Sequence, residues 1–113
     1  MTLKEIAALL DADVVAGADK LEHEIEKCFA SDLMSDVLTL KDTPLLVSGL
    51  CNMQTIRTCD MAGIDYIIIV RAKKITDDMR EEAEENGMVL MGCRYSLFKT
   101  CGLLYGAGVK PLY

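Results

Sequence analysis

The chain has 113 residues, of which 51% are hydrophobic and 27% charged, a length and composition typical of one globular domain. Its 18 acidic and 12 basic side chains give a formal net charge of −6, which repels phosphate backbones and argues against nucleic acid as the main partner. The longest apolar runs, such as residues 66–70, are much shorter than the roughly 20 residues of a membrane-spanning helix, so we expect a soluble protein without a membrane partner.

The cysteines are five in number, and none belongs to a Cys-x-x-Cys pair. All lie in or beside apolar stretches, where a free thiol behaves as a small hydrophobic side chain. We therefore expect free and mostly buried thiols in a chain that folds in the reducing cytoplasm. The residues are Cys28, Cys51, Cys59, Cys93 and Cys101.

The first predicted elements are a helix and a short strand. Thr2 and Glu5 have the spacing of a capping box, in which each side chain satisfies a backbone amide of the other at the start of a helix. The residues that follow are apolar at helical spacing, and the predicted helix ends near residues 11–13. Residues 14–16 are then predicted as a short strand that Gly17 closes.

The charged segment at residues 20–26 is predicted as an exposed loop or edge strand. Residues 28–30 are apolar enough for a buried strand. Ser31 and Asp32 are good helix-capping residues, and the apolar residues after them recur at three- and four-residue spacing. This pattern predicts a short helix that ends near Leu40.

Beyond Pro44, a strand and a helix alternate three times. Strands are predicted at residues 45–47, 66–70 and 88–91, and the middle one is a continuous apolar run of the kind that is buried on both faces of a parallel sheet. The first helix is predicted at residues 52–62, with Gly63 as its stop. The second begins after Thr76 and the third after Ser96, since both residues are good caps.

The last two predicted helices have different surroundings. The helix after Thr76 has few apolar residues beyond Met79 and Ala83, so its many carboxylates are interpreted as a solvated face. The final helix carries the strongest amphipathic stripe of the chain, which we expect to face the core. This stripe consists of Leu97, Phe98, Cys101, Leu104 and Tyr105.

The alternation of strands and helices predicts an α/β fold class. Parallel strands joined by right-handed crossovers are required, because each helix has to cover one face of the sheet. We therefore expect a three-layer α/β/α arrangement with a mainly parallel sheet, formed by a single domain over residues 1–113.

The candidate binding site is the carboxyl edge of the predicted sheet. Ligands of open parallel sheets bind there, where loops and helix N-termini converge, and the loops bring several positive charges to this edge of an acidic molecule. A small anionic ligand fits that charge. The candidate residues are Ser31, Asp32, Ser48, Gly49, Asn52, Arg71, Lys73, Arg94 and Ser96. In the alternative interpretation, the polar residues only cap helices and the basic ones only solubilise the surface.

Catalysis has little support in the sequence. The only histidine, His23, lies in a glutamate-rich exposed segment, and the glycine patterns of phosphate-binding loops are absent. Cys51 and Cys93 are candidates for a shared metal or a redox pair, since helix N-termini at their positions would lower the pKa of a thiol. The missing Cys-x-x-Cys spacing and the lack of histidine ligands argue against this, so we expect no enzymatic activity, cofactor or metal.

Several segments, over nearly the whole chain, resemble a stand-alone DRTGG domain. They are Leu3-Lys4-Glu5-Ile6-Ala7 with Gly17, residues 30–36, residues 45–49 leading to Ile56-Arg57, and residues 62–64. Such domains occur alone, within some bacterial phosphotransacetylases, and between CBS domains of regulated pyrophosphatases. Their fold is similar to the N-terminal domains of HPr kinase and of Mur ligases such as MurF. The resemblance implies a regulatory or accessory domain without catalytic machinery, commonly a dimer.

The chain departs from the namesake pattern of that family at two places. Asn52-Met53 stand where the family has an Asp-Arg pair at the start of the middle helix. Arg71-Ala72-Lys73 stand where Thr-Gly-Gly follows the central strand. Whatever those family residues contact, this chain contacts differently or not at all.

Three functions remain open from the sequence. The favoured one is a non-catalytic module that binds a nucleotide or another small anion at the carboxyl edge of its sheet. The alternatives are a protein-interaction module that regulates a partner enzyme, and a cysteine-based metal or redox protein. We also expect a homodimer, because one short helix cannot bury the whole apolar tail at residues 109–113.

Overall fold

The middle layer of the molecule is a six-stranded sheet in the order β1-β5-β4-β3-β2-β6. The computed structural model describes all residues from Met1 to Tyr113. The strands are β1 (Asp13–Ala16), β2 (Lys27–Ala30), β3 (Leu45–Ser48), β4 (Tyr66–Ile69), β5 (Val89–Gly92) and β6 (Lys110–Pro111). The helices are α1 (Leu3–Leu10), α2 (Met34–Leu38), α3 (Met53–Ala62), α4 (Asp77–Glu85) and α5 (Leu97–Gly106), with a single 3-10 turn at Ala18–Lys20.

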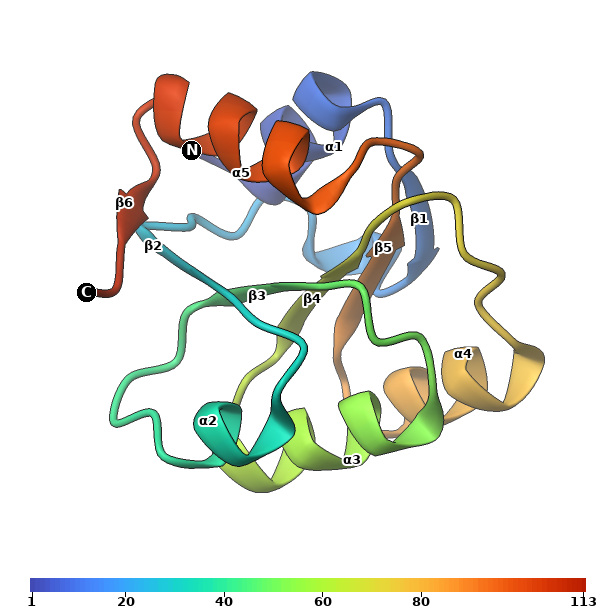
Figure 1. Ribbon diagram of the computed structural model, residues 1–113. Coiled ribbons are helices and arrows are strands. Elements are labelled where there is room, and N and C mark those ends of the chain that lie inside the picture. Colours follow the sequence, from blue (N-terminus) through green and yellow to red (C-terminus); the bar gives the residue numbers. More distant parts are fainter.

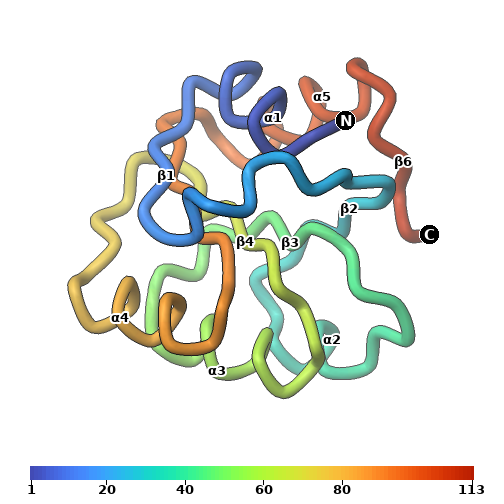
Figure 2. The backbone as a smooth tube through the Cα atoms, turned by 180° about the vertical axis from the view of Figure 1, so that it is seen from behind, coloured from blue at the N-terminus to red at the C-terminus, as the bar shows by residue number.

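The helices form two layers, one on each side of the sheet. Helices α1 and α5 cover one face, and α2, α3 and α4 cover the other, as Figures 1 and 2 show from opposite sides. The predicted α/β class with a three-layer arrangement is therefore confirmed. None of the helices is both long and apolar enough to cross a membrane.

Strand β4 lies at the centre of the sheet. It pairs in parallel with β3 on one side and β5 on the other, with Ile67 opposite both Leu46 and Leu90. The prediction that these three strands are parallel neighbours is therefore confirmed. Strand β2 extends the parallel set next to β3, whereas β1 pairs with β5 in the antiparallel direction.

Two apolar cores lie on opposite faces of β4. Ile68 and Val70 belong to the core beneath α1 and α5, while Ile67 and Ile69 belong to the core above α2, α3 and α4. These four side chains are at most 2% exposed. The continuous apolar run of the middle strand is thus explained by burial on both faces.

The first half of the chain differs in two places from the sequence-based expectation. Strand β2 is half-buried, because only the two-residue strand β6 lies beyond it at the sheet edge. Helix α2 starts at Met34, and its N-cap residue Leu33 provides no side-chain hydrogen bond. The prediction that Ser31 and Asp32 cap this helix is therefore wrong.

The apolar stripe predicted for α5 is only partly correct. Thr100 and Leu104 are buried, but Phe98 is 91% exposed and Tyr105 is 71% exposed. The buried side of the helix follows the 97, 100, 101, 104 spacing, and a residue one position further along lies about 100° around the helix. Phe98 and Tyr105 therefore point away from the core.

The C-terminal tail pairs with β2 as strand β6, which the sequence did not indicate. Lys110 lies opposite Lys27, and Pro111 lies opposite Cys28. Val109 is buried, whereas the ring of Tyr113 is 84% exposed and meets Phe29 edge to face, with ring centroids 6.1 Å apart. The tail thus covers part of the sheet edge and remains half open to solvent.

Gly17 is expected to be intolerant of any side chain. It has a left-handed backbone at φ 83°, and a Cβ atom there would lie 2.6 Å from the carbonyl oxygen of Met88. We expect Gly17→Ala to lower the free energy of unfolding by about 2–4 kcal/mol, because backbone strain and a clash with the segment entering β5 add together. Gly63 is the matched control, since its φ is 75° and its Cβ would lie 3.7 Å from the nearest atom. Gly63→Ala should cost about 1 kcal/mol in urea unfolding, and equal losses would contradict the clash.

Cys59 is expected to make the protein less stable at alkaline pH. Its thiol is fully buried, and this burial raises its pKa from the ordinary 9.0 to about 12. Because the folded pKa lies above the unfolded value, the contribution to stability is complete below pH 9.0 and is lost as the pH rises toward about 12. In urea unfolding over that range, the free energy of unfolding of the wild type should fall more steeply than that of Cys59→Ala. Parallel pH profiles would contradict the burial effect.

Candidate functional site

The loops after β2 and β3 meet at the carboxyl edge of the sheet through Asp32. One carboxylate oxygen of Asp32 accepts hydrogen bonds from the Ser48 hydroxyl at 3.1 Å and from the Gly49 backbone N–H at 2.6 Å. The Ser48 hydroxyl, which is fully buried, in turn accepts a bond from the Leu50 backbone N–H at 3.1 Å. Asp32 therefore holds the loop after β3 in place instead of capping α2.

Lys73 brings the loop after β4 to the same place. Its ammonium group donates a hydrogen bond to the carbonyl oxygen of Gly49. A Cβ atom on Gly49 would lie 3.3 Å from Asp32 Oδ2 and 3.7 Å from Lys73 Nζ, so this glycine sits between the two charged groups. The structure thus brings together four of the predicted candidates: Asp32, Ser48, Gly49 and Lys73.

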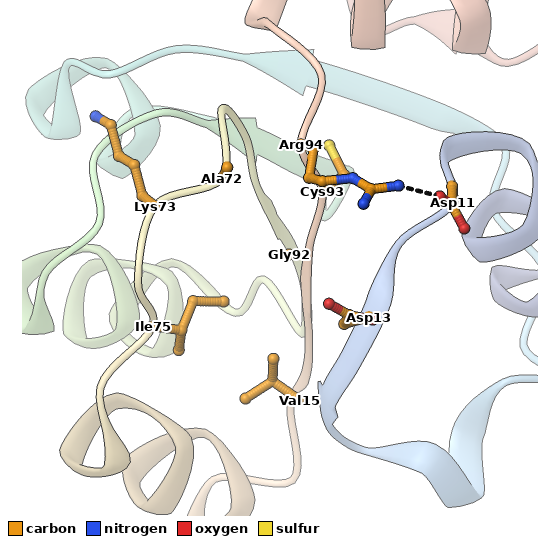
Figure 3. A pocket seen from close by; sticks show the side chains of 9 residues that line it. All are labelled: Asp11, Asp13, Val15, Ala72, Lys73, Ile75, Gly92, Cys93 and Arg94. Carbon is orange, nitrogen blue, oxygen red and sulfur yellow. Dashed lines mark hydrogen bonds and ion pairs between the residues drawn. The ribbon is translucent and has the colours of Figure 1, made fainter.

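A pocket of about 430 Å³ opens beside this cluster, between the loop after β4 and the start of β1. Figure 3 shows its side chains, with Lys73 reaching away from the middle of the pocket and Arg94 turned toward Asp11. Val15 and Ile75 form an apolar part of the wall. The lining residues are Asp11, Asp13, Val15, Ala72, Lys73, Ile75, Gly92, Cys93 and Arg94.

The rim of the pocket carries both signs of charge. Arg94 forms an ion pair with Asp11, with 2.5 Å between Nη2 and Oδ2, and both side chains are about 70% exposed. Such an exposed pair contributes little to stability, so Arg94 is available to another carboxylate or phosphate. Lys73 and Asp13 complete the charged groups, so the pocket combines two cations, two carboxylates and an apolar wall.

Backbone strain is concentrated at this pocket. The positive φ angles of non-glycine residues are those of Asp11 (48°), Arg71 (67°) and Ala72 (55°). Hydrogen bonds hold the last two in place, because the Arg71 N–H donates to the Tyr95 carbonyl at 2.8 Å and the Ala72 N–H donates to the Cys93 carbonyl at 2.9 Å. Each left-handed residue costs on the order of 1 kcal/mol or more, and such strain clusters at ligand sites.

The remaining predicted candidates have other positions. The side-chain oxygens of Asn52 and Ser96 accept hydrogen bonds from Thr55 and Lys99, respectively, and so cap α3 and α5. The Ser31 hydroxyl accepts a bond from the Leu33 N–H at 3.0 Å. Arg71 is exposed at the same edge, forms no ion pair, and does not line the pocket.

Sequence reasoning missed the contribution of the first strand to this site. Asp11, Asp13 and Val15 line the pocket because β1 runs antiparallel to β5, which places the start of β1 opposite Gly92 at the carboxyl edge. Four residues of sequence predict a short strand, but they do not show that this strand pairs in the antiparallel direction at the edge of the sheet. The only available signal was the pair of aspartates before the strand.

The cysteine interpretations lack geometric support. Cys51 packs against the core above α2, α3 and α4, whereas Cys93 lies in the core on the opposite face of the sheet. Burial raises the pKa of Cys51, and the nearby Lys73 opposes this shift only in part, so the expected lowering at a helix N-terminus is wrong for this thiol. His23 lies at the other edge of the sheet, where its Nδ1 is 2.8 Å from the Tyr66 hydroxyl.

Asp32 is expected to stabilise the carboxyl edge measurably. Asp32→Ala removes the acceptor of two hydrogen bonds and leaves the buried Ser48 hydroxyl without an acceptor for its proton, so we expect a loss of about 1–3 kcal/mol in the free energy of unfolding. Asp60 is the control, since its exposed carboxylate on α3 forms no hydrogen bond or ion pair. Asp60→Ala should change the stability by less than about 0.5 kcal/mol in urea unfolding. Equal effects of the two substitutions would refute the role of Asp32.

Comparisons with known proteins identify a similar fold but no family. The chain matches no protein-family model, and none of the curated proteins matches its sequence. It is similar to the CBS and DRTGG domains of the regulatory region of Clostridium perfringens pyrophosphatase. The crystal structure of those domains is a complex with the activator diadenosine tetraphosphate. The superposition has a TM-score of 0.72 at 11% sequence identity and covers 91% of this chain, which spans about half (45%) of the matched chain. The fold is thus DRTGG-like.

Proposed function

We propose that this chain is a regulatory or accessory domain that binds a small anionic ligand, such as a nucleotide, at the carboxyl edge of its sheet. The observation that carries the proposal is the pocket at this edge, where Arg94 and Lys73 meet an apolar wall beside three strained residues. The pocket has room for a small molecule, and its only cysteine, Cys93, is buried. Binding is therefore favoured over covalent chemistry.

The DRTGG-like fold supports a regulatory role. The similar region of the pyrophosphatase was crystallised with a nucleotide activator, and this chain spans less than half of it. Membership of the DRTGG family, a single domain over residues 1–113, and a partner enzyme that responds to the ligand are parts of the same proposal. No catalytic role is assigned to any residue.

In the proposed complex, the arginines contact the anion, and Lys73 joins them by turning from the Gly49 carbonyl oxygen into the pocket. Arg94 exchanges its exposed partner Asp11 for the ligand, and Arg71 reaches in from the neighbouring loop. Arginine can hold two oxygens of one phosphate or carboxylate group, which makes it the stronger contact. Ser31, Asn52 and Ser96 contribute hydroxyl or backbone donors from the ends of the neighbouring loops.

A protein-interaction module is the second candidate function, and helix α4 favours it. Six of the nine residues of α4 are acidic, and Arg80 forms ion pairs with two of them, Asp77 and Glu84. An exposed acidic helix of this kind suits a basic surface of a partner enzyme. This candidate requires no small ligand.

Thermal shift measurements with ATP, diadenosine tetraphosphate and inorganic phosphate test the proposal. A ligand at about 100 times its Kd adds roughly 2.7 kcal/mol to the free energy of unfolding and raises Tm. Arg94→Ala and Lys73→Ala should each weaken binding about tenfold, because a charge-assisted hydrogen bond contributes roughly 1.5–3 kcal/mol. Asp11→Asn should strengthen binding, since it releases Arg94.

The control is Lys4→Ala. Lys4 is exposed in the first turn of α1, at the other end of the fold. Its affinity for each anion should match that of the wild type. Equal affinities in the Arg94, Lys73 and Lys4 variants would show that the edge is only a solvated surface. No shift with any of the anions would favour the interaction module.

A further inference from the structure

Asp13 is the charged side chain of the carboxyl-edge pocket that has no partner within the protein. It is exposed, and none of the ion pairs or side-chain hydrogen bonds of the molecule involves it. We propose that Asp13 holds the ribose of a nucleotide through its two neighbouring hydroxyls, so that the pocket selects ribonucleoside phosphates over simple anions. This inference rests on the proposed function, because it names the ligand class of the same pocket.

The charges of the pocket are balanced. Arg94 pairs with Asp11, and Lys73 donates a hydrogen bond to the Gly49 carbonyl oxygen. The two cations and the two carboxylates cancel, so a bare anion gains little attraction from the pocket as a whole, and Asp13 repels it. A ligand that binds here therefore needs hydrogen-bond donors in addition to its negative charge, because an ionised carboxylate only accepts hydrogen bonds.

The pairing of β1 fixes Asp13 at the pocket. The strand runs antiparallel to β5, which places Asp13 opposite Gly92 at the carboxyl edge. Val14 packs against the core beneath α1 and α5, and Val15 packs against the core on the other face. Because side chains alternate along a strand, Asp13 and Val15 share one face, with their backbones about 7 Å apart.

An apolar wall lies next to Asp13, on the side away from Arg94. Figure 3 shows Val15 and Ile75 close together there, with Asp13 between them and the ion pair of Arg94. Gly92 makes room for this wall, since a Cβ atom on it would lie 3.2 Å from Cδ1 of Ile75. Two half-buried aliphatic side chains suit the flat face of a base.

The order of the groups along the pocket matches the order of the parts of a nucleotide. The base would lie at Val15 and Ile75, the ribose at Asp13 and the phosphate at Arg94. Two neighbouring hydroxyls can donate to the two oxygens of one carboxylate, and acidic residues bind the ribose in this way in dinucleotide-binding folds. The volume of about 430 Å³ is within the range of small-molecule sites.

The phosphate end of the pocket has backbone donors as well as cations. The N–H groups of Lys73 and Arg94 form no hydrogen bond within the protein, whereas those of Arg71 and Ala72 donate to carbonyl groups of the loop after β5. Free N–H groups at a turn can bind anions. A phosphate at this end thus has donors that do not depend on the release of Arg94 from Asp11.

Isothermal titration calorimetry with AMP, GMP, CMP and UMP, the 2′-deoxy form of each, and inorganic phosphate tests the inference. Each ribonucleotide that binds should do so about tenfold or more tightly than its 2′-deoxy form, because the loss of one hydroxyl leaves a carboxylate oxygen without its donor. Inorganic phosphate should bind more weakly than either form, since it offers Asp13 no ribose hydroxyl.

Asp13→Ala separates recognition of the ribose from attraction of charge. The substitution removes a negative charge, so a purely electrostatic effect would tighten the binding of every anion. We expect instead that the affinity for the ribonucleotide falls to that for its 2′-deoxy form, while the binding of the 2′-deoxy form and of phosphate is not weakened. The Tm of the ligand-free protein should hardly change, because the side chain is exposed and unpaired.

Asp11→Asn is the charge-matched control, since it also removes a carboxylate charge from this pocket. It should strengthen the binding of the ribonucleotide and of its 2′-deoxy form by the same factor, so that their ratio stays unchanged. Asp60→Ala, at an exposed position of α3, should alter neither affinity.

The possible outcomes distinguish this inference from the proposed function. Equal binding of the ribonucleotides and their 2′-deoxy forms, or an unchanged ratio in Asp13→Ala, would overturn the role of Asp13 and leave anion binding at this edge intact. Phosphate that binds as tightly as the nucleotides would do the same. If none of these compounds binds, the proposed function and this inference are both wrong.

Discussion

The burial of β4 on both faces is the constraint on which the rest of the structure depends. The side chains of Ile67, Ile68 and Ile69 alternate between two cores and are nearly inaccessible to water, so the backbone groups of the strand have to bond to β3 and β5. Strands that are covered on both faces are joined by helical crossovers, which makes them parallel. As a result, the carboxyl ends of four strands meet at one edge of the sheet.

The chemistry of the carboxyl edge follows from this convergence. Asp32, Gly49 and Lys73 follow three different strands, and hydrogen bonds join them because the strands end side by side. The loops after β4 and β5 are joined in the same way through the strained residues Arg71 and Ala72. An edge with exposed cations suits a small anion. The opposite edge is formed by the loops that lead into the parallel strands.

The sheet also separates the two outer surfaces of the molecule by charge. Acidic α4 lies on one side, and α5, which has no acidic residue, lies on the other. Ser96, which caps α5, lies two residues after Arg94, so the pocket and the first turn of α5 are close in sequence.

The sequence by itself determined the elements whose signals are local. The capping box of Thr2 and Glu5, the caps Asn52, Thr76 and Ser96, and the apolar run of β4 all depend on neighbouring residues, and the structure contains each of them. From these elements, the parallel sheet and its carboxyl edge could be predicted.

Only the tertiary structure decided which way α5 is turned, since a rotation by one residue exposes Phe98. It also decided where Asp11 and Asp13 lie, since β1 joins the sheet through its partner β5. Asp32 was recognised as a candidate but was assigned as a cap, because the hydrogen bonds that occupy it come from a strand that is distant in sequence. Contacts between distant segments set these features, and no local pattern of residues encodes them.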